Sequence, residues 1–179
     1  GSDHGHESVG RSIHVGNWLL QQGLESELQH GRIAVASQGT SALIYATEKA
    51  RAALVELLPR LRQEAWAGTV LTGEALARTG LSGRELFAAV DTARRDEQNA
   101  YGVVGTRWLV EDGEGPPEIG CGHHGGLGPQ ETRPFLVLMH PSLGSGTIGH
   151  ATSLVDIAPT ILSFLGQPAD RLDGRALTA

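Results

Sequence analysis

The sequence is poor in cysteine and in aromatic residues. Its 179 residues include one cysteine, Cys121, and only 4% Phe, Trp and Tyr. A single thiol excludes a disulfide framework and a zinc finger built from several cysteines, and it leaves the cellular compartment open. No stretch approaches the roughly 20 consecutive apolar residues that span a bilayer, so we expect no membrane segment.

Positive charge is also scarce. Lys and Arg number 14 against 20 Asp and Glu, which gives a formal net charge of -6. Proteins that bind duplex nucleic acid gather phosphates on a basic surface, so duplex binding is disfavoured. The 40% hydrophobic and 19% charged content is typical of a globular protein. A chain of this length can bury a core without disulfides.

Glycine and histidine are the abundant residue types. The chain has 25 glycines and 8 histidines. Half of the histidines fall in two glycine-flanked segments: His4, His6, His123 and His124. Imidazole is a common metal ligand, and glycine lets the backbone approach a cation closely, so this distribution suggests a metal site.

Hydrophobic periodicity predicts strands that alternate with helices, which indicates an α/β fold. The predicted strands are 11–15, 33–36, 42–46, 69–71 and 107–110, and the predicted helices are 17–22, 48–66 and 73–79. Residues 24–31 are expected to form a polar connection, and 85–92 fits a strand or a helix. Pro59 conflicts with the long helix, which it should kink or divide.

The C-terminal third contains two strongly apolar segments. Residues 135–139 form a continuous apolar run, which predicts a strand buried on both faces. Ser153 can cap a helix that is apolar almost all round and is closed by Gly166, so we expect this helix to lie in a core.

The first histidine segment, SDHGH at 2–6, places a carboxylate and an imidazole next to each other before a glycine. Asp3 and His4 suit a metal-binding loop at a strand end, although such a pair can also be a solvated cap. His6 lies two residues further on, on the same face of an extended segment, where it could orient a ligand from the outer shell.

The second histidine segment, GCGHHGGL at 120–127, has too many glycines for a favourable helix or strand. It is either a flexible surface loop or a loop whose shape serves a site. Zinc usually has three or four protein ligands, and Asp3, His4 and one histidine of the 123–124 pair supply three ligands of the right chemistry.

Several motifs together resemble a known family. They are SDHGH at 2–6, GHHGGL at 122–127, TRPFLVL at 132–138, SLVDIAPTILSFLG at 153–166 and LDGRAL at 172–177. In order and spacing they resemble the C-terminal half of the alkaline phosphatase superfamily, and most of all its type I phosphodiesterase and nucleotide pyrophosphatase branch. Residues 24–115 resemble that family only loosely.

The resemblance implies a fold and a metal site. The fold would be a partial alkaline phosphatase-like core, a mostly parallel sheet with flanking helices, formed by 1–29 and 116–179, with 30–115 as an inserted α+β cap. Two divalent ions, of the zinc type, would be bound. Asp3 and His4 would hold the ion that also holds the nucleophile, and His124 would hold its neighbour, with His6 and His123 as outer residues.

The resemblance also implies a function. In that family the nucleophilic Thr or Ser lies upstream of the SDHG motif, so we expect no catalytic nucleophile within these residues. The expected function is a metal-dependent phosphoester hydrolase for a small substrate such as a nucleotide. It would be active with the remainder of its own chain upstream and inactive as this chain alone. Alternatives are a sulfatase, phosphonate hydrolase or phosphomutase of the same superfamily, or a non-catalytic metal-binding domain.

Overall fold

The computed structural model describes residues 1–81, 83–113, 115–141, 143–147 and 149–177. The chain divides into two compact units. The larger unit is His4–Pro134, and the smaller unit combines Gly1–Asp3 with the residues from Phe135 onward. None of the helices in the described ranges is long and apolar enough to cross a membrane.

The first sheet of the larger unit carries the two histidine segments. Its strand order is β6-β7-β1-β8. The strands are β1 (Glu7–Ile13), β6 (Arg95–Gln98), β7 (Val104–Val110) and β8 (Gly122–His123). Among the described strands only β1 and β7 pair in parallel, and every other pair is antiparallel. The α/β class is confirmed in its mixed form, whereas the prediction of a mostly parallel sheet is wrong.

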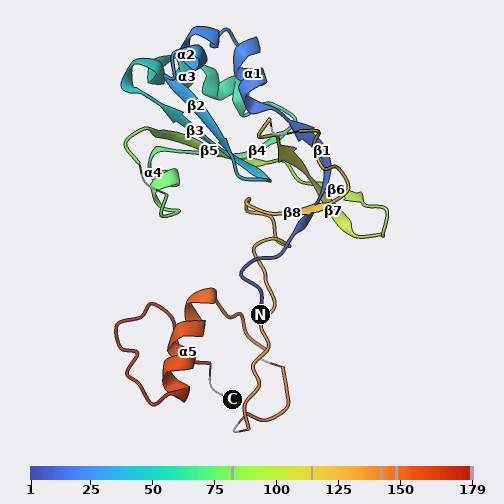
Figure 1. Ribbon diagram of the computed structural model, residues 1–179, viewed down its shortest axis with the longest axis vertical. Helices are drawn as coiled ribbons and strands as arrows, with labels where there is room; N and C mark the ends of the chain where they lie inside the picture. Colours follow the sequence, from blue (N-terminus) through green and yellow to red (C-terminus); the bar gives the residue numbers. More distant parts are fainter. Residues whose placement is uncertain (82, 114, 142, 148, 178–179) are drawn as a thin grey trace. The chain divides into compact units, whose positions relative to one another are not determined.

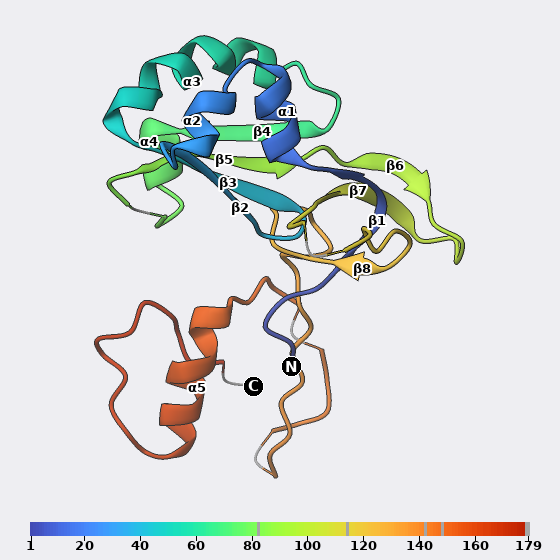
Figure 2. The ribbon, with the colours of Figure 1, turned by 45° about the horizontal axis from the view of Figure 1, so that its top comes forward.

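The second sheet is antiparallel throughout, with the strand order β2-β3-β5-β4. Its strands are β2 (Ile33–Ser37), β3 (Ser41–Ala46), β4 (Ala67–Thr72) and β5 (Leu86–Thr92). The helices of this unit are α1 (Val15–Gln21), α2 (Glu25–Gln29), α3 (Glu48–Leu61) and α4 (Gly73–Ala77). Helices α1, α2 and α3 cover one face of this sheet (Figures 1 and 2).

The hydrophobic core lies between these helices and the second sheet. Alternate residues of β3, beginning with Ala42 and Ile44, are buried against it, as the period of two in a strand requires. Helix α3 contributes Leu54, which is 3% exposed. Trp18 and Trp66 meet edge to face with their ring centroids 5.7 Å apart, a favoured aromatic geometry.

Most of the elements predicted in the larger unit are present, with shifted ends. Helix α3 contains Pro59 and ends at Leu61 instead of Trp66, because proline has no N–H and weakens the turn around it. Residues 85–92, which fitted two states, are largely strand β5. Helix α2 lies in the segment that we expected to be a connection, and β6 was not predicted.

The two apolar segments of the smaller unit differ from their predictions. Residues 135–139 form no strand, and Phe135, Val137 and Met139 are exposed. The helical segment consists of a 3₁₀ turn at Leu154–Asp156 and α5 (Ile157–Phe164), with several exposed apolar side chains. Burial on both faces requires covering layers. The described residues of this unit supply none for 135–139 and bury α5 only at Pro159 and Thr160, so both burial predictions are wrong here.

The predicted cap, residues 30–115, includes parts of both sheets. Strands β2 to β5 pair only with one another among the described residues, and α3 packs on them. Strands β6 and β7 fall in the same range but pair with β1 or with each other. The role of this segment as a cap stays a prediction.

The core packing gives a first test, for which adjacent residues of α3 form a matched pair. Leu54 is buried, whereas Val55 is 54% exposed. We expect Leu54→Ala to lower the free energy of unfolding by about 2–5 kcal/mol, because it leaves a cavity. Val55→Ala should change it by less than about 0.5 kcal/mol. Urea unfolding followed by tryptophan fluorescence measures both, and equal effects would contradict this packing.

Asp156 gives a second test, in the smaller unit. Its carboxylate accepts hydrogen bonds from the backbone N–H groups of Arg175 (3.0 Å) and Ser153 (2.8 Å), and these lower the pKa of Asp156. A lowered pKa means that the stabilisation is present above the ordinary aspartate pKa of about 3.9 and is lost as the pH falls through the folded-state value.

We therefore expect amide exchange at Arg175 and Ser153 to accelerate in Asp156→Ala, measured by NMR at neutral pH. After correction for the intrinsic exchange rate, the same two amides of the wild-type chain should show this acceleration only in acid. The neighbouring Asp173→Ala is the control, and an identical effect there would argue against the capping role.

Candidate metal centre

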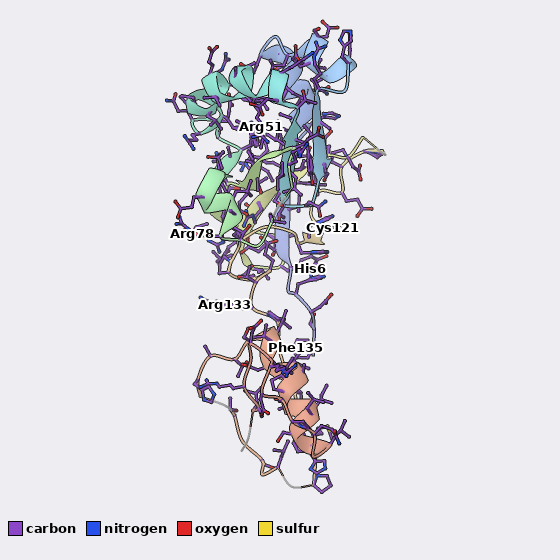
Figure 3. The ribbon with its side chains drawn as sticks, turned by 90° about the vertical axis from the view of Figure 1, so that its left-hand side faces the viewer. His6, Arg51, Arg78, Cys121, Arg133 and Phe135 are labelled. Carbon is purple, nitrogen blue, oxygen red and sulfur yellow. The ribbon has the colours of Figure 1, made fainter. Side chains whose placement is uncertain are left out.

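Pairing between β1 and β8 brings the two histidine segments together. Glu7 lies opposite His123 in this antiparallel pair, and Ser8 lies opposite Gly122. The pairing continues through Val9, whose N–H donates to the carbonyl of Cys121 at 2.9 Å. In the other direction the pairing ends at Glu7 and His123, so His6 and His124 each directly adjoin the last paired residues. Figure 3 labels His6 at the start of β1 and Cys121 just before β8.

Three imidazoles gather at this end of the sheet. The rings of His4 and His124 are stacked, with centroids 3.6 Å apart and planes 19° apart. His6 meets both edge to face, at 5.1 Å from His4 and 5.5 Å from His124. One ring nitrogen from each of the three lies within 4.8 Å of the other two.

Local hydrogen bonds orient two of the four histidines. Nδ1 of His4 lies 2.9 Å from the carbonyl oxygen of Gly5. A proton on Nδ1 satisfies that carbonyl and puts the lone pair on Nε2, the arrangement that metal-bound histidines commonly have. Nδ1 of His123 instead accepts from the backbone N–H of His124 at 3.2 Å, and His123 does not belong to the three-imidazole group.

The surroundings of His124 disfavour the charged form of its imidazole. Burial lowers the pKa of the His124 imidazole, and the neighbouring His4, His123 and His6 lower it further, against an opposing effect of Glu131. A neutral imidazole has the lone pair that a metal requires. The protonation state of His124 near neutral pH therefore suits a ligand.

A buried charge network lies beneath the histidine segments. The Arg107 side chain, 1% exposed, pairs with Glu131 at 2.9 Å and lies 3.7 Å from Glu7. Arg107 also pairs with Asp91. Burial raises the pKa of Asp91. The hydrogen bond from the N–H of Leu127 and the charge of Arg107 act in the opposite direction and lower it. Local sequence patterns did not indicate these residues, although an arginine within the apolar strand β7 was the available signal.

Glu131 joins this network to both histidine segments. Its carboxylate accepts from the N–H groups of Gly126 and Gly128, at 2.9 Å each, and its backbone carbonyl accepts from Gly5 at 2.8 Å. Asp91 binds the intervening amide, that of Leu127, at 2.7 Å. The backbone N–H groups of Gly126, Leu127 and Gly128 thus all donate to buried or half-buried carboxylates.

The glycines of the second segment allow this close approach. A Cβ atom on Gly126 would clash with Asp91 and Thr40, and one on Gly128 would clash with Glu7. Gly125 has a φ of 111° and lies against the Gln38 carbonyl. Any larger residue would push the loop away from the network, which explains why glycine follows the two histidines.

The predicted site residues are placed as follows. His4 and His124 lie together, His6 joins them, and His123 lies beside His124 with ring centroids 5.8 Å apart. Asp3 belongs to the smaller unit, and its participation in the site stays a prediction.

The three imidazoles of His4, His6 and His124 suit a transition-metal ion chemically. Three imidazole nitrogens suit Zn²⁺, and catalytic zinc commonly has three protein ligands and one open position. The known proteins add no independent evidence, since no family model, curated protein or solved structure gives a significant match to this chain.

The buried network gives a third test. Arg107→Met would leave Glu7, Asp91 and Glu131 without their shared cation, and we expect the free energy of unfolding to fall by about 3–5 kcal/mol. Arg11→Met is the control, because the Arg11–Glu97 pair is 40% and 47% exposed and should contribute less than about 1 kcal/mol. Urea unfolding distinguishes the two variants. An Arg107→Met protein with the same free energy of unfolding as the wild type would contradict the network.

Proposed function

We propose that this chain is the metal-binding, C-terminal part of a phosphoester hydrolase of the phosphodiesterase or nucleotide pyrophosphatase type. One observation carries the proposal. His4 and His124 lie about 120 residues apart in the sequence, in two of the five motifs that carry the resemblance, and their rings are stacked at 3.6 Å.

The residues of this chain would hold and orient the metal centre. His4 and His124, with Asp3 as the resemblance expects, are the proposed ligands. Two zinc-like ions, when bound, would activate the nucleophile and stabilise charge on the phosphoryl oxygens. Residues 124–128 are called the His124 loop. The Arg107–Glu131 network would keep this loop in place against the first histidine segment, because Glu131 accepts from the N–H groups of Gly126 and Gly128.

The nucleophile and the remaining metal ligands are proposed to lie upstream of Gly1, where the resemblance places them. The exposed apolar residues of the smaller unit support an additional covering partner. Phe135, Val137, Met139, Ile161 and Leu165 are each more than half exposed. Large exposed apolar patches commonly mark an interaction surface, and upstream chain is the partner that we propose.

The second sheet is proposed to act as a cap that selects the substrate. Its turn before β3 contacts the His124 loop, since the N–H of Thr40 donates to the carbonyl of His124 at 3.0 Å. The hydroxyl of Ser41 donates to the carbonyl of Gly125 at 2.6 Å. Segments that contact a catalytic loop in this way are well placed to shape its specificity.

A non-catalytic metal-binding domain is the second candidate function. It is favoured by the three-imidazole group, all of which lies within the larger unit. This candidate would bind an ion without turnover in any length of chain.

Activity distinguishes the two candidates. We expect the 179-residue chain to hydrolyse bis-p-nitrophenyl phosphate at no more than the background rate in added zinc, because loss of a nucleophile costs many orders of magnitude in rate. A protein extended upstream by its natural sequence should hydrolyse it, and His124→Ala should abolish that activity. His123→Ala is the matched control.

An extended protein that binds zinc without hydrolysing any phosphoester, sulfate ester or phosphonate would favour the non-catalytic domain. Turnover by the short chain that is lost in His124→Ala would show that its residues include a nucleophile or use a metal-bound hydroxide.

A further inference from the structure

We propose that β2, an edge strand of the second sheet, pairs with β2 of a second copy of this chain. The pairing is antiparallel and centred on Val35, and it joins two four-stranded sheets into one. This inference goes beyond the hydrolase proposal, because it needs neither a metal ion nor an upstream segment.

The backbone of β2 bonds to β3 through its even-numbered residues. The N–H of Gln38 donates to the carbonyl of Ser41 at 2.8 Å, and the N–H of Thr47 donates to the carbonyl of Arg32 at 2.9 Å. Between these two bonds the strands pair over five residues without a register shift. Directly bonded pairs alternate with unbonded pairs in an antiparallel ladder, so the residues between the even-numbered ones direct their N–H and C=O groups away from β3.

The outward-directed backbone groups are those of Ile33, Val35 and Ser37. Strand β2 has β3 as its only neighbour in the sheet order (Figure 2). The described residues make no hydrogen bond to these outward groups. A row of such groups along a sheet edge is a template for another strand.

The other three edges of the two sheets are protected, whereas β2 is not. Strand β6 is entirely exposed, carries three charged residues and pairs irregularly with β7. Strand β4 has a register irregularity between Ala67 and Thr69, and β8 is two residues long. Bulges, charges and short length are the usual means of preventing edge pairing. The sequence of β2, IAVAS, has no charge and no proline, and its register is regular.

The outward groups of β2 are complementary to themselves. Two-fold pairing about Val35 sets Ile33 opposite Ser37 of the second copy, and each such pair can exchange both N–H···O bonds. Positions 34 and 36 then face each other, and both are alanine, so no bulky or charged side chain obstructs the approach. Arg32 falls opposite position 38, a glutamine, so like charges do not meet. These features favour a second copy as the partner.

The mass of the 179-residue chain as a function of concentration gives the first measurement. We expect light scattering after size exclusion to show twice the mass of one chain at high concentration and a single chain on dilution, over a range of about 1 µM to 1 mM. A chelator is present throughout, so the result does not depend on the metal centre.

Paired charges on β2 test the register. Ala34→Lys with Ala36→Lys places lysine opposite lysine twice across the two-fold axis, and we expect the dimer dissociation constant to rise about tenfold or more. Ala34→Lys with Ala36→Glu places opposite charges in the same two pairs and should restore the wild-type constant to within about threefold. Thr69→Lys, at an exposed position on the opposite edge strand β4, is the control and should change nothing. Circular dichroism checks that each variant is folded.

Hydrogen–deuterium exchange of the 33–37 segment locates the contact. The amides of Ile33, Val35 and Ser37 should be protected at high concentration and exchange at least about tenfold faster on dilution, because only the second copy bonds them. The amides of Ala34 and Ala36 should stay protected at both concentrations, because β3 bonds them.

A chain that remains monomeric up to about 1 mM overturns the inference, as does a dimer in which the amides of 33, 35 and 37 are not protected. A dimer that survives the double lysine variant but is lost in Met139→Lys would place the contact at the exposed apolar residues of the smaller unit. Protection that is independent of concentration in the upstream-extended protein would assign the edge to upstream chain instead. None of these outcomes bears on phosphoester turnover, which decides the hydrolase proposal separately.

Discussion

The buried ion pair between Arg107 and Glu131 is the interaction on which the arrangement of the larger unit depends. Arg107 comes from a strand of the first sheet, and Glu131 follows the second histidine segment. Both side chains are 1% exposed. A buried charge is costly unless it is paired and fully hydrogen-bonded. Glu131 meets this requirement with loop amides and the Thr40 hydroxyl, so the cost of burying the pair fixes the shape of the loop.

The same region joins the two sheets. The hydroxyl of Thr92 lies 2.9 Å from the carbonyls of both Thr40 and Trp108, which belong to opposite sides of the junction. The N–H of Val110 donates to the carbonyl of Gly39 at 2.7 Å. The turn before β3 therefore contacts β7 and the His124 loop together. A change in this turn would therefore alter the position of the residues around His124.

Local sequence patterns predicted the elements of the larger unit well, because burial there follows a regular period. Helix α3 buries Ala50, Leu54 and Leu61 at helical spacing, and strand β3 buries Ala42, Ile44 and Ala46 at alternate positions. The predictions were wrong for residues 135–139 and for the burial of α5, which are equally apolar. An apolar run indicates only that a segment is suited to burial. Whether it is buried depends on covering layers, which the described residues of the smaller unit supply only for Pro159 and Thr160 of α5.

The sequence by itself determined that four histidines lie in two glycine-flanked segments, a composition that suits a metal loop whatever the fold. It also determined the α/β class, through the spacing of apolar residues. Only the tertiary structure decided that His6 lies with His4 and His124, because the pairing of β1 with β8 brings the two histidine segments together. It alone showed that Glu7, Asp91, Arg107 and Glu131 form one network. Such long-range pairings arise between residues about 15 to 125 positions apart in the sequence, and no local periodicity encodes which distant residues will meet.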